Sequence, residues 1–158
     1  MISHHVNPIP DGYHSVTPSL LIRGGNQAIE FYKMAFGAEE LERMMSPEGT
    51  QVMHAALRIG NSIIMLSDEF PQAAAKSPAA LNGSTVQIHL YVEDADATFR
   101  QALDAGAKEV MPLENTFWGD RFGSIIDPFG HLWGIATHIE DVSPEEMEER
   151  FKKLMAAG

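Results

Sequence analysis

The stretch VQIHLYVEDADATFRQALDAGAKEV, residues 86–110, contains a strand pattern, a helix pattern and the start of another strand. Its first seven residues alternate between aliphatic and polar side chains, which is typical of a strand with two different faces. Asp94 is placed to cap a helix over 95–105, and Gly106 is typical of a glycine just beyond a helix end. The stretch therefore predicts a strand–helix–strand unit.

The same order of patterns occurs earlier in the chain. A strand pattern at 16–22 precedes a helix pattern at 26–35, and Gly37 follows that helix. Three more strands are predicted in each copy, at 41–46, 52–59 and 63–67 and at 108–113, 122–126 and 132–138. A unit that cannot bury its apolar face alone is expected to pack against its copy. The repeat predicts an α+β fold, with tandem βαβββ modules forming a cupped mixed sheet around a central cleft.

With 158 residues, the chain is long enough for one well-buried core and short for two independent domains. The predicted boundaries are an N-terminal extension at 1–14, one domain at 15–140 and a C-terminal helix at 141–158. Within the domain, module one covers 15–68, a crossover loop 69–85 and module two 86–138. The C-terminal helix is predicted because Ser143-Pro144-Glu145-Glu146 combines a helix cap with a proline in the first turn.

Composition narrows the possible partners. A net charge of −11 argues against nucleic acid and anionic membranes, which attract clustered lysine and arginine. The chain has no cysteine, so disulfides and thiolate chemistry are excluded. It contains no apolar run of the roughly 18–20 residues that cross a bilayer, and its start lacks the pattern of a signal peptide. A cytoplasmic location is expected.

Two features favour a small-molecule site. Gln87, His89 and Tyr91 share one face of the strand at 86–92, so that face is expected to meet water or a ligand. The loop at 114–121 carries Trp118 and Arg121, an unusual composition for a solvated turn. It is interpreted either as a ligand wall or as part of a dimer interface, and the sequence does not choose between them.

These residues resemble those of a known family. The tandem units, the Ile29-Glu30-Phe31-Tyr32 segment and the Asp127-Pro128-Phe129-Gly130-His131 hairpin resemble the vicinal oxygen chelate superfamily. That superfamily holds glyoxalase I, ring-cleaving dioxygenases and the fosfomycin and bleomycin resistance proteins. Within it, the segment FWGDRFG at 117–123, followed by that hairpin, looks like the PhnB-like, glyoxalase-like subgroup. The resemblance covers residues 15–138.

The resemblance implies a divalent metal held between the modules by His, Glu or Gln. Alignment places the four ligand positions at Thr17, Met65, Gln87 and Gly134. Gln87 is the one normal ligand among them, whereas a hard or borderline divalent ion needs several His or carboxylate ligands. No metal cofactor is therefore expected in the usual geometry. A divalent metal remains possible at a displaced site, for which the candidate ligands are Gln87, His89, His54 and His138.

The resemblance also implies a cleft lined by apolar and neutral polar groups. The predicted ligand-binding residues are Thr17, Ser19, Met65, Ser67, Gln87, His89, Tyr91, Trp118, Arg121 and Gly134. The main hypothesis is a protein that binds a small amphipathic molecule in the inter-module cleft without the usual metal site. The alternative is a lyase, isomerase or dioxygenase-type enzyme related to glyoxalase, using His89 as a general acid or base or using a displaced metal. A homodimer held by Trp118 and the C-terminal helix is also expected.

Overall fold

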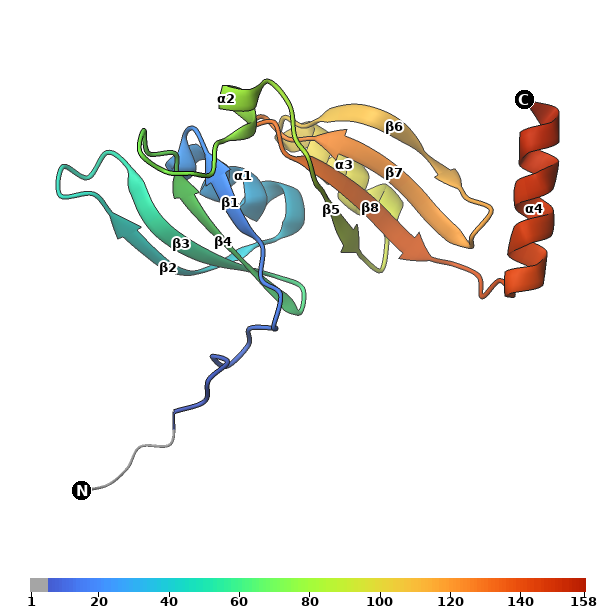
Figure 1. The fold of residues 1–158 in the computed structure, drawn as a ribbon, viewed down its shortest axis with the longest axis horizontal. Helices are drawn as coiled ribbons and strands as arrows, with labels where there is room; N and C mark the ends of the chain where they lie inside the picture. The colour runs from blue at the N-terminus through green and yellow to red at the C-terminus, as the bar shows by residue number, and fades with distance from the viewer. Residues whose placement is uncertain (1–5) are drawn as a thin grey trace. The chain divides into compact units, whose positions relative to one another are not determined.

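A computed structural model describes residues 6–158, so the first five residues of the predicted N-terminal extension lie outside the described part. The chain divides into two compact units, the first ending at Gly83 and the second covering Ser84–Gly158. Each unit contains its own four-stranded mixed sheet (Figure 1). This confirms the predicted α+β class with one βαβββ module in each half of the chain and a C-terminal helix.

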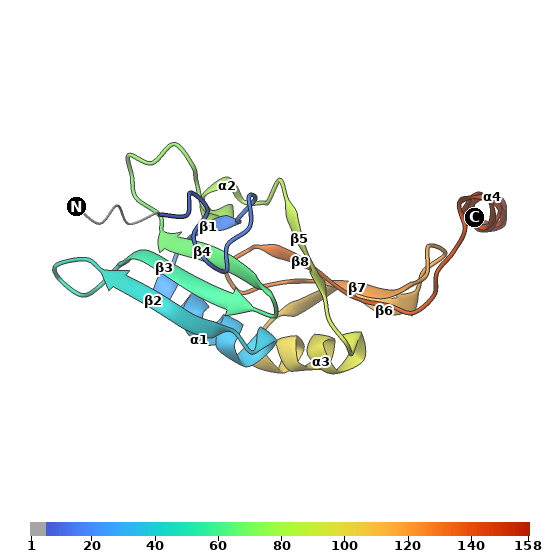
Figure 2. The ribbon, with the colours of Figure 1, turned by 90° about the horizontal axis from the view of Figure 1, so that it is seen from below.

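The first unit consists of β1 (Ser19–Ile22), α1 (Gly25–Phe36), β2 (Glu39–Met45), β3 (Val52–Ile59), β4 (Ser62–Asp68) and α2 (Pro78–Leu81). Its strand order is β1-β4-β3-β2, with β1 and β4 parallel and the other pairs antiparallel. Helix α1 buries Ile29 and Tyr32 completely. Figure 2 shows α1 on one face of this sheet and the N-terminal segment on the other.

A buried carboxylate fixes the start of α1. Asp68, at the end of β4, accepts hydrogen bonds from the backbone N–H groups of Gly24 at 3.0 Å and Gly25 at 2.9 Å. Its other oxygen accepts one from Val52 N–H at 2.7 Å, at the start of β3. The first N–H groups of a helix have no partner within the helix, so an acceptor here satisfies them. Asp68 therefore joins a helix and two strands at one point.

Two predictions about the first unit need correction. The strand predicted at 16–22 begins only at Ser19, because Pro18 cannot donate a ladder hydrogen bond, and Val16 is 86 % exposed. The crossover segment 69–85, predicted as a loop throughout, contains the short helix α2. Ser77 caps α2 by accepting from Ala80 N–H, and it also binds Glu69. Those bonds give order to part of the segment.

The second unit consists of β5 (Gln87–Tyr91), α3 (Ala95–Ala105), β6 (Lys108–Asn115), β7 (Asp120–Ile126), β8 (Leu132–His138) and α4 (Pro144–Ala157). Its strand order, β5-β8-β7-β6, repeats that of the first unit. Helix α3 buries Phe99 and Ala102. Half of the segment predicted as a loop at 114–121 is strand, because β6 extends to Asn115 and β7 begins at Asp120, which leaves only 116–119 as the turn.

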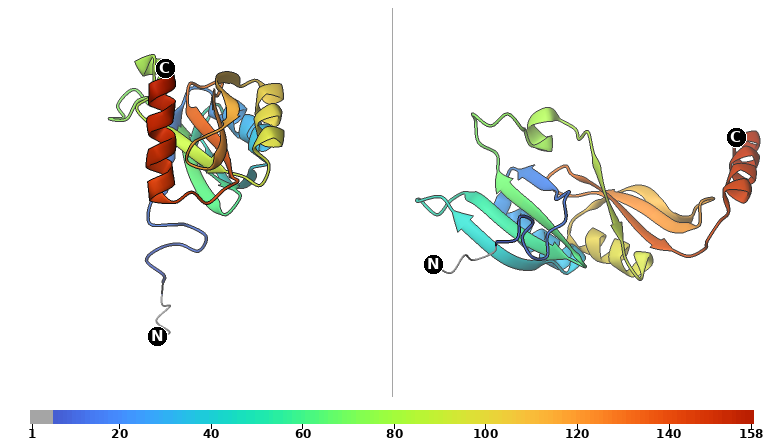
Figure 3. Two further views of the ribbon diagram at one scale, coloured as in Figure 1. Left: turned by 90° about the vertical axis from the view of Figure 1, so that its right-hand side faces the viewer. Right: turned by 60° about the horizontal axis from the view of Figure 1, so that its bottom comes forward.

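The C-terminal helix α4 begins as predicted, with the Ser143 hydroxyl accepting from Glu146 N–H. None of its residues, all of which the structure describes, is buried, and Figure 3 shows it standing apart from the sheet of its unit. Arg150 holds it through an ion pair with Glu140, and Phe151 contacts Phe117 at 5.4 Å between ring centroids. Its predicted role in a homodimer stays a prediction. In the described part of the chain, no helix combines the length and apolar character needed to span a membrane.

Replacing Asp68 should destabilise the first unit strongly. In Asp68→Ala, three backbone N–H groups lose a charged acceptor, so we expect unfolding free energy to fall by about 3 kcal/mol. Glu48, an exposed carboxylate in the β2–β3 turn, supplies the control, and Glu48→Ala should change stability by less than about 0.5 kcal/mol. Urea denaturation measures both variants. Equal midpoints for the two would contradict the structural role of Asp68.

Candidate functional site

The two modules present equivalent positions on equivalent faces. In the first unit Ser19 pairs with Met65, and in the second His89 pairs with Gly134. Directly paired residues on neighbouring strands point to the same side of a sheet. This side is the one opposite α1 in the first unit and opposite α3 in the second, and we refer to it in each unit as the open face.

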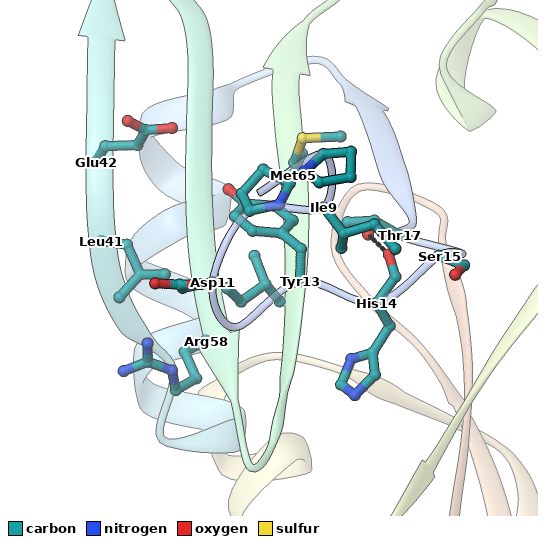
Figure 4. Close-up of a pocket in the computed structure, with 13 residues that line it drawn as sticks. Ile9, Asp11, Tyr13, His14, Ser15, Thr17, Leu41, Glu42, Arg58 and Met65 are labelled. Carbon is teal, nitrogen blue, oxygen red and sulfur yellow. Dashed lines mark hydrogen bonds between the residues drawn. The ribbon is translucent and has the colours of Figure 1, made fainter. Parts of the chain in front are cut away.

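On the open face of the first unit lies a hollow of about 680 Å³, within the roughly 300–1,000 Å³ range of small-molecule pockets. The lining residues are Pro8, Ile9, Pro10, Asp11, Tyr13, His14, Ser15, Thr17, Leu41, Glu42, Arg58, Ile63 and Met65 (Figure 4). Thr17 and Met65 were predicted ligand-binding residues, and the structure brings them together here. Ser19 and Ser67, also predicted, are not among the lining residues.

The sheet provides an apolar floor and a charged rim to this hollow. Leu41, Ile63 and Met65 supply the apolar part, and Ile63 is 4 % exposed. On the rim, Arg58 forms an ion pair with Glu39 at 3.0 Å. Glu42, also on the rim, contacts His54 Nε2 at 3.0 Å. The sequence does not determine toward which face of its strand His54 points. In the structure its side chain is bonded to Glu42 beside the hollow.

The open face of the second unit carries a cluster of rings around a glycine. A Cβ atom built on Gly134 would lie 2.6 Å from Gln87 Nε2, 2.9 Å from Phe122 Cε2 and 3.0 Å from His89 Nδ1. The His89 ring stacks on Phe122 with centroids 5.6 Å apart and an interplanar angle of 6°. The ring centroid of Tyr91 lies 4.6 Å from that of His89, with an interplanar angle of 57°. The predicted residues Gln87, His89, Tyr91 and Gly134 are thus brought together.

A buried carboxylate next to this cluster was missed from the sequence. Asp120 is 2 % exposed and accepts hydrogen bonds from Tyr91 OH at 3.0 Å, Trp118 Nε1 at 3.0 Å and His138 Nδ1 at 2.8 Å. Burial opposes its ionisation, but the hydrogen bonds from His138, Tyr91 and Trp118 hold the pKa of Asp120 below its ordinary value. The bond to Asp120 raises the pKa of the Tyr91 phenol, which stays a donor.

His138 and Arg121 are committed to other partners. His138 bonds Asp120 through Nδ1 and Asp141 through Nε2, each at 2.8 Å, so both ring nitrogens are engaged. Its bond to Asp141, followed by that to Asp120, raises the pKa of the His138 imidazole. Arg121 pairs with Asp96 of α3 at 2.8 Å, which places it on the helix side of the sheet. The structure therefore does not bring Arg121 together with Gln87 and His89.

The residues present do not fit the metal site implied by the resemblance. Thr17 and Met65 offer a hydroxyl and a thioether, Gln87 offers an amide, and Gly134 offers no side chain. This set lacks the imidazole and carboxylate ligands that replace the water of a divalent ion. Among residues 6–158, no three His, Cys, Asp or Glu side chains are grouped so that they could hold a metal ion.

The fold agrees with what comparison with known proteins shows. The Glyoxalase/Bleomycin resistance protein/Dioxygenase superfamily matches residues 15–135, and the chain belongs to this superfamily. An uncharacterized protein of Mycobacterium tuberculosis, Rv0887c, is 42 % identical over 137 residues, covering 85 % of this chain and 80 % of that protein.

Two solved structures extend the comparison. The Arabidopsis thaliana protein At5g48480 has a TM-score of 0.63 and 31 % identity, covering 78 % of this chain and 98 % of that one. The PhnB protein of Bacillus cereus has a TM-score of 0.63 at 19 % identity, covering 78 % of this chain and 99 % of that one. The likeness to PhnB shows a shared fold.

A methyl group at Gly134 should disturb the ring cluster. In Gly134→Ala, the added carbon approaches Gln87, Phe122 and His89 at 3.0 Å or less, so we expect a loss of about 1 kcal/mol in stability. The side-chain amide resonances of Gln87 and the ring resonances of His89 should shift in NMR spectra. Gly83→Ala is the control, because a Cβ there meets no atom within 4 Å. Unshifted His89 resonances in Gly134→Ala would contradict the described geometry.

Proposed function

We propose that this protein binds a small amphipathic organic molecule without the metal site of its superfamily. The observation that carries the proposal is the hollow beside Thr17 and Met65, the two positions of the first unit at which the resemblance places metal ligands. A hollow with an apolar floor and a few polar groups at its rim is typical of a site for a small organic molecule. The superfamily position is thus kept as a binding surface while its metal ligands are replaced.

The ring cluster of the second unit supports the same proposal. His89, Phe122 and Tyr91 present flat faces, and aromatic ligands stack on such faces with ring centroids about 4.5–7 Å apart. Gln87 adds an amide that can both donate and accept hydrogen bonds. Asp120 fixes Tyr91 and Trp118 through hydrogen bonds, which lowers the entropy that ligand binding would otherwise cost. The face is therefore organised before a ligand arrives.

Binding is tested with the uncharged dye Nile red, whose fluorescence rises in apolar sites. The wild-type protein should bind it, and Met65→Trp should weaken binding by roughly tenfold because the larger side chain fills the hollow. Met53→Trp is the control, since Met53 is 39 % exposed on β3 and does not line the hollow. A thermal-shift screen of organic metabolites then searches for the natural ligand, which should raise the melting temperature by mass action. The proposal fails if folded wild-type protein binds neither the dye nor any library member.

The metal content of the purified protein separates this proposal from its enzymatic alternative. We expect no stoichiometric zinc, nickel, iron or manganese, and no rise in melting temperature when these ions are added, because three of the four implied ligand positions lack suitable donors. Elemental analysis by plasma mass spectrometry measures the first point. One tightly bound ion per chain, lost in a Gln87→Ala and His89→Ala double variant, would instead favour a glyoxalase-type enzyme with a displaced metal site.

A further inference from the structure

The hollow of the first unit is bounded partly by a segment that lies outside the superfamily match. The match begins at residue 15, yet residues 8–14 supply much of the lining. Figure 4 shows this segment crossing in front of the sheet, with Ile9, Tyr13 and Met65 gathered on one side of the hollow and Leu41 and Glu42 on the other. We name residues 8–14 the N-terminal strap.

The strap rests directly on the sheet at Gly12. This glycine has a φ of +83°, a conformation that L side chains rarely adopt. A Cβ built on it would lie 3.3 Å from Ile63 Cδ1 and 3.8 Å from Arg58 Nη2. The close approach contributes to the burial of Ile63, although Ile63 points away from α1. A residue with a side chain at position 12 would therefore have a strained backbone and would force the tip of Ile63 to shift by a few tenths of an ångström.

Internal hydrogen bonds and prolines give the strap a defined shape. Tyr13 N–H donates to the Pro10 carbonyl at 3.1 Å, and the Thr17 hydroxyl donates to the His14 carbonyl at 3.0 Å. Pro8 and Pro10 each have a fixed φ, which lowers the conformational entropy lost when the strap is ordered. The strap is thus tied to Thr17, a residue that itself lines the hollow.

The charges around the hollow disfavour an anionic ligand. Among the residues that line it, all within the described part of the chain, Arg58 is the one Lys or Arg, and it is already paired with Glu39. Asp11 of the strap and Glu42 of β2 add two carboxylates. The whole chain carries a net charge of −11, which repels anions as they approach.

We propose that the N-terminal strap is a binding wall added to the superfamily fold, and that it makes the hollow selective for uncharged or cationic amphipathic molecules. This inference rests on the proposed function, because it concerns the same hollow. It adds the class of ligand. It also assigns ligand contacts to Ile9, Asp11 and Tyr13, three residues that lie outside the superfamily match.

Charge selectivity is measured with three flat dyes on the full-length wild-type protein. Uncharged Nile red and cationic thioflavin T should both bind, whereas anionic anilinonaphthalene sulfonate should bind roughly tenfold more weakly than thioflavin T. The difference between the two charged dyes should shrink at high salt, since salt screens the repulsion. Equal affinity for the two charged dyes at low salt would overturn the predicted selectivity.

The role of the strap is measured by comparing Gly12→Val with Gly49→Val. Both glycines have positive φ, at +83° and +70°, so both variants carry similar backbone strain, but a Cβ on Gly49 meets no atom within 4 Å. Gly12→Val should weaken Nile red binding by roughly tenfold, and Gly49→Val by less than about twofold. If wild type binds the dye and Gly12→Val binds it equally well, the strap is no wall, although the proposed function stands.

A milder pair keeps the test decisive if Gly12→Val does not fold. Ile9 lines the hollow, whereas Val6 lies just before the strap, is 79 % exposed and does not line it. Ile9→Ser should weaken Nile red binding by roughly threefold, since apolar contact with the dye is lost, while Val6→Ser should leave it unchanged. Equal affinities for this pair would also overturn the role of the strap. A wild-type protein that binds none of the dyes would instead overturn the proposed function itself.

Discussion

The parallel pairing of the first and last strand of each module is the constraint on which the open faces depend. Because β1 pairs with β4 as β5 pairs with β8, the side chains facing away from each helix are fixed in register. A shift of one residue would turn Met65 or Gly134 toward the helix and remove it from the open face. Strand pairing in each unit therefore decides which residues the open face presents.

The two modules anchor the starts of their helices to that strand pair by different chemistry. In the first unit the carboxylate of Asp68, at the end of β4, accepts from two N–H groups at the start of α1. In the second, the hydroxyl of Thr137 near the end of β8 accepts from Ala95 N–H and donates to the Val92 carbonyl. Both residues lie near the end of the last strand of their module. The N–H groups at the helix start thus find an acceptor at a similar place in each module, a carboxylate in one and a hydroxyl in the other.

Much of the fold was predictable because the local patterns agree with the tertiary contacts. The alternation at 86–92 correctly placed Gln87, His89 and Tyr91 on one face, and Asp94 caps α3 as its position predicted. The facing of His54 was not predictable, because register shifts between β2 and β3 break the simple alternation that a sequence shows. Arg121 was grouped with the ligand residues because β7 was predicted to start after it, whereas β7 starts at Asp120 and turns Arg121 toward Asp96.

The parts of the candidate site that the sequence did not predict lie in segments without a repeating hydrophobic pattern. Residues 8–14 form neither helix nor strand, so no repeating pattern indicated that they meet Ile63 and Arg58. Asp120 sat in a predicted loop, where a carboxylate is expected to be solvated, and only the pairing of Asp120 with His138 across β7 and β8 reveals its burial. The available signals were two prolines, Pro8 and Pro10, and Asp120, which lies between Trp118 and Phe122 in the sequence. Neither signal indicates which residues these segments contact.

The duplicated architecture has an evolutionary consequence. Equivalent positions hold a thioether at Met65 and a bare backbone at Gly134, so the halves have already diverged where their strands correspond. Each sheet has its own helix, and each unit is compact by itself. Duplication thus leaves two copies of one scaffold in a single chain, and each copy can accumulate its own substitutions on its open face.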